Sequence, residues 1–341
     1  MSSPDLIGTL FALAVSCLLN LWFFVNLKAH AVNLSESQTS IPVTLPKGWW
    51  SNPDRFEAER RAIFSQTWMC VSHRGRFKTP GDYIVYEIAG FRFFMILGKD
   101  KIVRSFHNVC RHRAFPVAKK QYGSATTLGC RYHGWSYDTT GRLTKAPIFE
   151  DKPGFDKSQN SLFEIYTRED RLGFLHINPG TDAKVAKSFP TEGITTGKLA
   201  RITPGVKQLS SFELEGAFNW KIIVDDFAST AASTLATGLA KCFPMLFPTP
   251  EAKLDFYPLT TVHTASGSPF WYQLTYNPIS ATKTALRCYV YSIKNSENFL
   301  FEQSDRRNLE QAMKKKIQGL EAEHKKVTSF GYDSASAYHK D

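Results

Sequence analysis

The sequence has few cysteines and only one long apolar run, and these two shortages exclude whole classes of protein. Only 6 of its 341 residues are cysteine, too few for a disulfide scaffold, so some thiols are expected to be free to bind metal. Because only residues 6–27 reach membrane-spanning length, a multi-span membrane protein is excluded. Internal repeats and low-complexity tracts are lacking too, and 43% hydrophobic with 21% charged residues excludes disorder and collagen.

Acidic residues are in the minority. The 42 Lys and Arg exceed the 31 Asp and Glu and give a formal net charge of +11, which suits nucleic acid, an anionic membrane or an acidic protein partner. Nucleic acid is not expected, because the aromatic residues (13%) alternate with apolar strand positions and not with basic stretches. The length is enough for about two domains.

Residues 6–27 are almost entirely apolar, and a helix needs about 20 such residues to cross a bilayer. The run predicts a single transmembrane anchor. A cleaved secretory signal is the alternative, since residues 29–31 resemble a cleavage site, but no basic residue precedes the run. Lys28, Lys47 and Arg55 follow it, so the positive-inside bias leaves the bulk of the protein in the cytosol. We expect a single-pass protein of the endoplasmic reticulum membrane.

Five segments are predicted along the chain. They are an N-terminal tail (1–5), the anchor (6–27), a polar tether (28–45), a small all-β domain with a preceding helix (46–180) and a second domain (181–341). Asn52-Pro53 predicts the start of the helix before the β domain. In the second domain strand-like runs such as FWYQLTY are followed by a long charged helix, 302–326.

Two short motifs in the β domain have the spacing of metal ligands. Cys110-x-His112 is followed, after 17 residues, by Cys130-x-x-His133. A tetrahedral zinc site is one reading of two Cys and two His. The glycines and aromatic residues around the second motif favour a Rieske [2Fe–2S] cluster, in which two thiolates hold one iron and two imidazoles hold the other. Cys110, His112, Cys130 and His133 are therefore the predicted cluster ligands.

The segments FHNVCRHRAFPV and CRYHGWSYDTTGRL resemble the amino half of Rieske non-haem iron oxygenases. The resemblance is to the choline-monooxygenase-like and ring-hydroxylating α-subunit branch, in the form common in filamentous fungi. It runs from Trp49 to Pro179, resumes at residues 218–221 and returns at residues 270–292. It implies an α+β fold: an all-β Rieske domain followed by a START-like helix-grip domain that holds a mononuclear iron.

The sequence departs from this family at the mononuclear iron. The family binds that iron with two His and one carboxylate, but the register after Asn-Trp-Lys places Ala232 and Thr237 at the two His positions and Ser229 at the acidic position that links the two metal sites. Asp305 alone matches the distal carboxylate, as a vestigial ligand. His263 is the one histidine of this region, and its strand-like context favours an ordinary strand residue. We expect a shortened domain with a doubtful mononuclear Fe(II).

In this family the cluster of one chain faces the mononuclear iron of its neighbour, so a chain that keeps only His112 and His133 can still donate electrons. We therefore predict a hetero-oligomer, a trimeric ring with an iron-competent homologous subunit that oxygenates a small metabolite in natural-product biosynthesis. An NAD(P)H-dependent reductase or a ferredoxin supplies the electrons. The alternatives are a self-sufficient oxygenase with an altered iron site that uses His263 and carboxylates, and a membrane-anchored scaffold or zinc module.

Overall fold

A computed structural model describes residues 45–46, 48–182, 184, 189, 199, 201–223, 252–264, 268–293 and 300–329. The chain divides into two units, Met1–Leu45 and Pro46–Asp341. The predicted tail, anchor and tether lie outside the described residues apart from Leu45, so they stay predictions. Within the part of the chain that is described, no helix has the length and hydropathy needed to cross a membrane.

The unit Pro46–Asp341 begins with the helix predicted at Asn52-Pro53. The α-helix α2 (Pro53–Glu59) continues into one π-helical turn, η1 (Arg60–Phe64). The Asn52 side chain caps α2 by accepting hydrogen bonds from the backbone N–H groups of the next residues, at 2.7 and 3.2 Å. Proline at the first turn costs nothing there, because that N–H has no helical partner.

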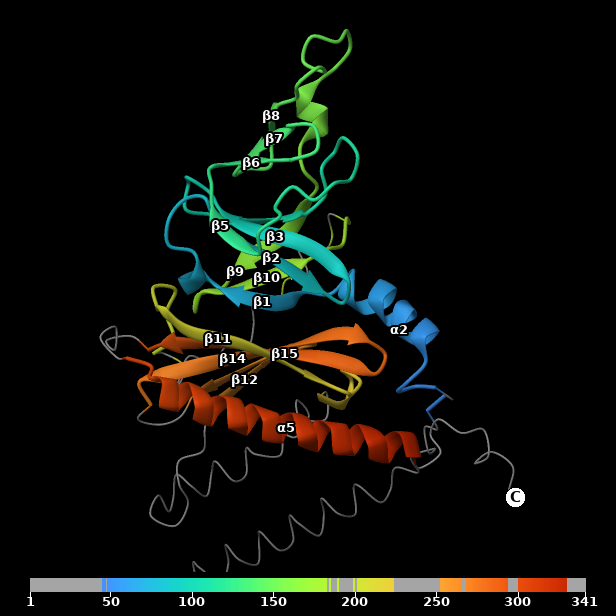
Figure 1. Ribbon diagram of the computed structural model, residues 1–341, viewed down its shortest axis with the longest axis vertical. Helices are drawn as coiled ribbons and strands as arrows, with labels where there is room; N and C mark the ends of the chain where they lie inside the picture. The colour runs from blue at the N-terminus through green and yellow to red at the C-terminus, as the bar shows by residue number, and fades with distance from the viewer. Residues whose placement is uncertain are drawn as a thin grey trace, which may run out of the picture. The chain divides into compact units, whose positions relative to one another are not determined.

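A seven-stranded antiparallel sheet follows, and it contains most of the predicted β domain (Figure 1). Its strands, in spatial order, are β1 (Met69–His73), β10 (Phe174–Asn178), β9 (Glu164–Glu169), β4 (Val103–His107), β3 (Phe91–Leu97), β2 (Asp82–Ile88) and β5 (Tyr122–Ser124). Strand β3 is apolar and buried from Phe93 to Leu97 because both of its faces are covered there: Phe93 and Met95 join one core, whereas Phe94 and Ile96 join another. The turn η2 (Arg74–Arg76) follows β1.

A three-stranded sheet lies at the end of the seven-stranded sheet farthest from helix α5, at the top of Figure 1. It consists of β6 (Thr127–Gly129), β7 (Ser136–Asp138) and β8 (Leu143–Lys145), and the short helix η3 (Lys157–Asn160) contacts it. Both predicted metal motifs connect to this sheet or to β4 through short loops. The predicted all-β domain is confirmed.

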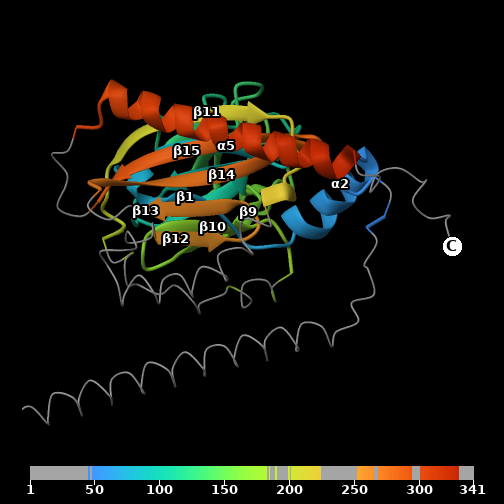
Figure 2. The same ribbon diagram turned by 90° about the horizontal axis from the view of Figure 1, so that it is seen from below.

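The predicted second domain contains a five-stranded antiparallel sheet crossed by one long helix (Figure 2). The strands, in spatial order, are β11 (Gln208–Gly216), β15 (Lys283–Ser292), β14 (Phe270–Ser280), β13 (Thr260–Thr264) and β12 (Ala252–Phe256), and the helix is α5 (Gln303–Ser329). Met313, Ile317 and Leu320 of α5 pack on Leu274 and Leu286 of the sheet. The predicted strands and the predicted charged helix are confirmed. The mixed helix and sheet content expected of an α+β fold is confirmed as well.

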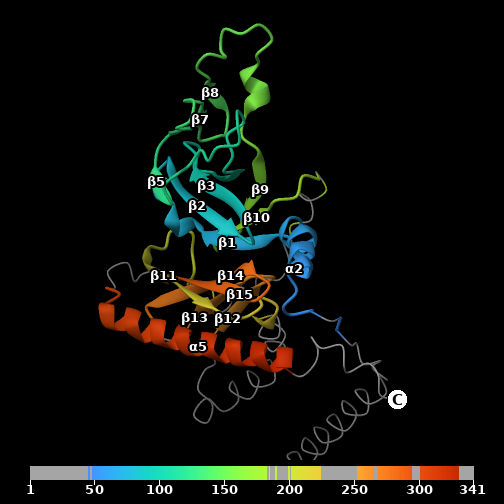
Figure 3. The same cartoon turned by 45° about the vertical axis from the view of Figure 1, so that its right-hand side comes forward.

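The other face of the five-stranded sheet packs on the seven-stranded sheet (Figure 3). One buried core contains Cys70 and Phe174 of the seven-stranded sheet together with Trp271 and Tyr291 of the five-stranded sheet. The domain boundary predicted at residue 180 lies just after β10. Residues Pro46–Asp341 form one compact unit that is not divided at this point, so the boundary stays a prediction.

The Asn-Trp-Lys motif (residues 219–221) follows β11 and joins the five-stranded sheet to helix α2 and the residues just before it. Trp220 Nε1 donates to Glu59 Oε2 at 2.9 Å, and the Lys221 ammonium forms an ion pair with the same carboxylate. Asn219 Nδ2 donates to the backbone carbonyl of Trp50 at 3.0 Å. All three motif side chains therefore bind the segment that precedes β1, which gives the motif a structural role in this chain.

Candidate metal centre

The two predicted metal motifs form loops of the same shape. In each loop the Cys N–H donates to the carbonyl five residues on, and its carbonyl accepts from the N–H four residues on. The bonds are Cys110 N to Phe115 O (2.8 Å), Ala114 N to Cys110 O (2.9 Å), Cys130 N to Trp135 O (2.8 Å) and Gly134 N to Cys130 O (2.9 Å). Because both loops close on themselves, each holds a thiol and an imidazole in a fixed relation.

The tight closure requires a left-handed residue at the same place in both loops. Gly134 has φ of +73° and Ala114 has φ of +55°. Glycine adopts this conformation without strain, whereas alanine is strained there because its Cβ approaches the following carbonyl.

The two loops bring the four predicted donors together in pairs. The thiols of Cys110 and Cys130 are buried, with 2% and 3% of each residue exposed. Burial raises the pKa of Cys130, and a hydrogen bond with Cys110 raises it further, so the two sulfur atoms are adjacent. Hydrogen bonding from the backbone N–H groups of Tyr132 and His133 lowers the same pKa. N–H groups directed at sulfur stabilise a thiolate and raise the potential of a cluster.

The two imidazoles face each other. The ring centroids of His112 and His133 are 4.5 Å apart. His112 Nδ1 is buried and has no hydrogen-bond partner. Its ring stacks on Trp135 at 5.1 Å and 12° and meets the edge of Phe149. Burial lowers the pKa of His112, and the nearby His133 and Arg113 lower it further. His112 is therefore held as a neutral imidazole with a free nitrogen, the form that binds a metal.

These residues fit a binuclear cluster better than a single zinc ion. A tetrahedral zinc site needs four side chains that converge on one point, whereas here the thiols of Cys110 and Cys130 form one pair and the imidazoles of His112 and His133, with ring centroids 4.5 Å apart, form another. Two adjacent thiols and two facing imidazoles offer two donors to each of two irons, the ligation of a Rieske centre. Cys110, Cys130, His112 and His133 would hold such a [2Fe–2S] cluster, and it would supply reversible one-electron transfer.

Tyr137 contributes a hydrogen bond that sequence reasoning missed. Its hydroxyl oxygen accepts from the Arg111 N–H at 3.1 Å and lies 3.4 Å from Cys110 Sγ. Burial raises the pKa of this phenol, so it keeps its proton. Because the oxygen already accepts from an N–H, the hydroxyl hydrogen is available to the sulfur. In the sequence, the signal that could have identified this residue was a tyrosine seven residues after the second cysteine, Cys130.

Asn108 fixes the approach to the first loop, and sequence reasoning missed it as well. Its Oδ1 accepts from the N–H groups of Val117 and Ala118, both at 2.9 Å, and its Nδ2 donates to the Ala118 carbonyl at 2.8 Å. The side chain thus bridges the two ends of the loop that holds Cys110. A polar residue two positions before a cysteine carries no distinctive sequence signal.

The surface beside the imidazoles is apolar and basic. Phe115, Tyr132 and Ile148 are exposed there, and the Tyr132 ring lies 3.8 Å from the His133 ring. Arg113 and Arg131 are exposed as well, and within the described ranges neither forms an ion pair. A protein that docks here meets aromatic side chains and positive charge.

The residues expected near a mononuclear iron fall in different places. Ser229, Ala232 and Thr237 lie outside the described residues. Asp305 lies in the first turn of α5, and its Oδ2 accepts the Glu302 N–H at 3.0 Å, so the carboxylate caps the helix.

His263 lies in β13, as its sequence context predicted. Its Nε2 is 2.9 Å from Thr261 Oγ1, and its ring stacks on Tyr272 at 5.0 Å and 10°. Around neither His263 nor Asp305 does the described part of the chain place a three-residue group that could hold a metal ion.

Comparisons with known proteins agree with this geometry. Residues 67–156 match the family profile of the Rieske [2Fe-2S] domain. The carnitine monooxygenase oxygenase subunit of Acinetobacter baumannii is 31% identical over 185 residues, 54% of this chain and 50% of that protein. The 2-aminobenzenesulfonate 2,3-dioxygenase subunit alpha of an Alcaligenes species is 32% identical over 179 residues, 51% of this chain and 44% of that protein. The chain spans about half the length of these curated relatives.

Solved structures share the fold over most of the chain. A quaternary ammonium Rieske monooxygenase in complex with its substrate gamma-butyrobetaine superposes with a TM-score of 0.67 at 24% identity, covering 85% of this chain and 86% of that one. A naphthalene 1,2-dioxygenase bound to phenanthrene gives 0.57 at 16% identity, covering 83% and 80%. The structural likeness therefore extends beyond the cluster domain into the five-stranded sheet.

Proposed function

Since the chain contains a Rieske [2Fe–2S] domain, has Rieske oxygenase subunits as homologues and shares their fold, we propose that it delivers electrons from its cluster to an iron-competent homologous partner. The partner then oxygenates a small metabolite. The observation that carries this proposal is the contrast between a complete set of cluster donors and a single histidine, His263, between residues 200 and 305, where the family places two for its second iron.

The donating side is supported by the surface around the cluster ligands. His133 lies beside exposed aromatic residues, and Arg113 and Arg131 add positive charge. Charge of one sign at an electron-transfer surface steers a partner of the opposite sign and speeds the encounter. We therefore expect the accepting subunit, in a hetero-oligomeric trimeric ring, to present carboxylates to this surface. A ferredoxin or NAD(P)H-dependent reductase that donates to the cluster meets the same charges.

The sequence lacks the iron ligands that would be needed to accept electrons from a neighbouring cluster. The family's register gives Ala232 and Thr237 in place of imidazoles, and neither side chain can replace a nitrogen donor. Asp305 has the position of a ligand, but its carboxylate caps α5. The proposal therefore treats 181–341 as a shortened START-like helix-grip domain without mononuclear Fe(II), and it takes the likeness to the fungal branch as the reason to expect natural-product biosynthesis.

We also propose that residues 6–27 anchor the protein in the endoplasmic reticulum membrane, with the cluster domain in the cytosol. The net charge of +11 would favour an anionic membrane surface. Expression of the full chain with a fluorescent tag, followed by carbonate extraction, tests the anchor. Extraction of the tagged protein as a soluble species would contradict it.

Iron and sulfide analysis of the purified chain tests the central proposal. Two irons and two acid-labile sulfides per chain are expected, together with the rhombic spectrum of a reduced Rieske centre. Cys130→Ser is expected to lose both irons. Three irons per chain in the wild type would contradict the proposal and restore a second iron site.

Turnover assays separate the proposed role from its main alternative, a self-sufficient oxygenase with an altered iron site. That alternative is favoured by the names of the relatives, which are oxygenase subunits. Reconstitution with a reductase and NAD(P)H is expected to give product only when a homologous chain that has both iron histidines is added. Product formation by this chain alone would establish the alternative.

A further inference from the structure

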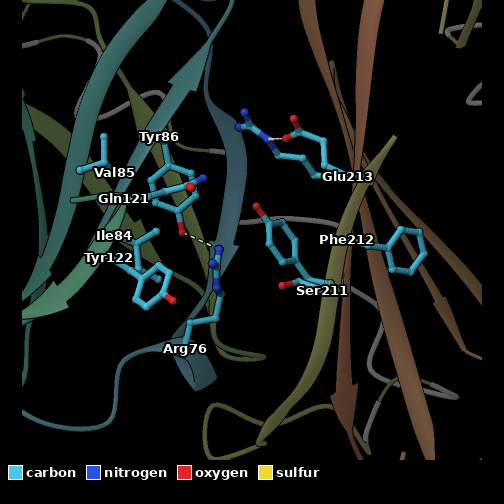
Figure 4. Close-up of a pocket in the computed structure, with 11 residues that line it drawn as sticks. Arg76, Ile84, Val85, Tyr86, Gln121, Tyr122, Ser211, Phe212 and Glu213 are labelled. Atoms are coloured by element: carbon cyan, nitrogen blue, oxygen red, sulfur yellow. Dashed lines mark hydrogen bonds and ion pairs between the residues drawn. The ribbon is translucent and has the colours of Figure 1, made fainter. Parts of the chain in front are cut away.

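A cavity of about 230 Å³ lies between the seven-stranded and the five-stranded sheets (Figure 4). One wall comes from β2, β5 and the turn η2, and the other comes from β11 and β15. None of the cluster ligands lines it. Nothing in the proposed electron transfer uses this cavity.

Arg76 is the main charged group of the cavity. Its Nε donates to Gln208 Oε1 at 3.0 Å, and one terminal nitrogen donates to the Tyr86 hydroxyl at 2.8 Å. The guanidinium also lies 4.2 Å from the centre of the Tyr289 ring. All of these partners are neutral, and no carboxylate of the described ranges forms an ion pair with Arg76.

The other charges of the cavity cancel. Arg287 and Glu213 form an ion pair across neighbouring strands. Burial raises the pKa of Tyr86 to about 12, so this phenol stays uncharged at neutral pH. The lining therefore has one positive charge in excess, that of Arg76. Arg76 is half-buried. A guanidinium partly withdrawn from water without a carboxylate partner is costly, and a bound anion would offset that cost.

The wall formed by the seven-stranded sheet is partly apolar. Ile84, Val85 and Tyr122 lie on the side of the cavity that bears Arg76 and Tyr86 (Figure 4). A cavity of this size, with one excess charge and an apolar wall, suits a ligand that has one negative group and a small apolar body. A doubly charged phosphate would exceed the positive charge available and would leave the apolar wall unused.

We propose that this cavity binds a small organic carboxylate, whose carboxylate group pairs with Arg76 and whose apolar part lies against Ile84 and Tyr122. Arginine presents planar paired donors that match a carboxylate. Because both sheets line the cavity, the bound ligand would stabilise the packing of the cluster domain on the second sheet. This inference is independent of the proposed electron transfer.

Isothermal titration calorimetry and thermal unfolding of the full, cluster-loaded chain test the proposal with benzoate, acetate and inorganic phosphate as probes. Saturable binding of benzoate and a rise in Tm are expected, with weaker binding of acetate and no saturable binding of phosphate. No saturable benzoate binding, or tighter binding of phosphate than of benzoate, would overturn the proposal.

Two variants locate the binding. Arg76→Gln keeps a hydrogen-bonding side chain and is expected to weaken benzoate by more than about tenfold, because a charge-assisted pair is lost. Glu213→Gln removes the carboxylate that neutralises Arg287 and so adds a second excess positive charge to the lining. It is expected to tighten benzoate, and it decides the question if Arg76→Gln does not fold. Arg142→Gln, which changes an exposed arginine paired with Asp138, is the control and should bind as wild type. Equal affinity in wild type, Arg76→Gln and Glu213→Gln would contradict the site.

Discussion

At the scale of single residues, the groups that tune the cluster are distinct from those that hold it. The four residues that the two loops bring together could be selected from the sequence by their recognisable spacing, and their role as cluster ligands stays a prediction. The hydroxyl of Tyr137 reaches Cys110 because β7 places this ring in the same buried core as both cysteines, and its hydrogen bonds to the sulfur and to the Arg111 N–H depend on that packing.

Replacing Tyr137 by phenylalanine should lower the reduction potential of the cluster. The lost O–H donor stabilises the more negative, reduced form more than the oxidised form, so a fall on the order of tens of millivolts is expected. A redox titration followed by electron paramagnetic resonance measures it. Tyr132→Phe, which changes an exposed ring beside His133, is the control for local packing. An unchanged potential in Tyr137→Phe would show that the hydroxyl does not act on the sulfur.

Ala114→Gly should stabilise the chain. Ala114 has a left-handed backbone that glycine adopts freely, and relief of that strain is expected to contribute about 0.5–1 kcal/mol. The reciprocal change, Gly134→Ala, places a Cβ 3.3 Å from Pro147 Cγ in the same conformation and should destabilise the second loop. Thermal unfolding of both variants checks the pair, and a lower Tm for Ala114→Gly would contradict the assignment of strain.

At the scale of elements, the buried cluster of Glu59, Trp220 and Lys221 joins α2 to the second sheet. The sequence identified Asn219-Trp220-Lys221 as a family signature, but it gave no means to find Glu59, which lies 161 residues before Trp220. The same limit applies to Asp305: an acidic residue in a first helical turn suits both a metal ligand and a cap. The structure shows the bond to the Glu302 N–H that makes it a cap, and the vestigial ligand role stays a prediction.

Glu59→Ala should destabilise the protein by about 3 kcal/mol, because it removes one partner of an ion pair whose two side chains are about nine-tenths buried and also the acceptor of the Trp220 Nε1–H. The double variant Glu59→Leu with Lys221→Met should cost less than the sum of the single changes, because neither charge remains. Glu57→Ala on the same helix removes only exposed ion pairs with Arg60 and Arg61 and should change stability little. Denaturant unfolding compares the four proteins, and additive losses would contradict a coupled pair.

At the scale of the whole molecule, His73 lies at the junction of the two large sheets. It is fully buried, and the rings of Phe174, Trp271 and Tyr291 surround it at 5.1–5.2 Å. Its Nε2 donates to the Leu172 carbonyl at 2.9 Å, and its Nδ1 accepts the Gly75 N–H at 3.1 Å. The ring is therefore neutral. Nothing in the sequence around residue 73 indicates this role, because the surrounding rings come from strands far along the chain.

Stability should fall as the pH drops from about 6.5 to about 4. Burial lowers the pKa of His73 to about 4 in the folded chain, so the unfolded chain binds a proton more readily in that window. The His73 contribution is complete above pH 6.5 and is lost progressively down to pH 4, up to about 3 kcal/mol. Unfolding of wild type and His73→Gln at several pH values isolates it. Equal pH dependence in the two proteins would contradict the prediction.

The apolar core shared by the two large sheets fixes the cluster domain in place. Some electron carriers work as a mobile head that swings between two docking stations, but Pro46–Asp341 form one compact unit whose sheets bury Phe174 against Trp271. A head of that kind would have to expose this core at each cycle. The predicted cluster site is therefore expected to keep its place relative to the five-stranded sheet, and under the proposed function an electron donor or acceptor would have to come to it.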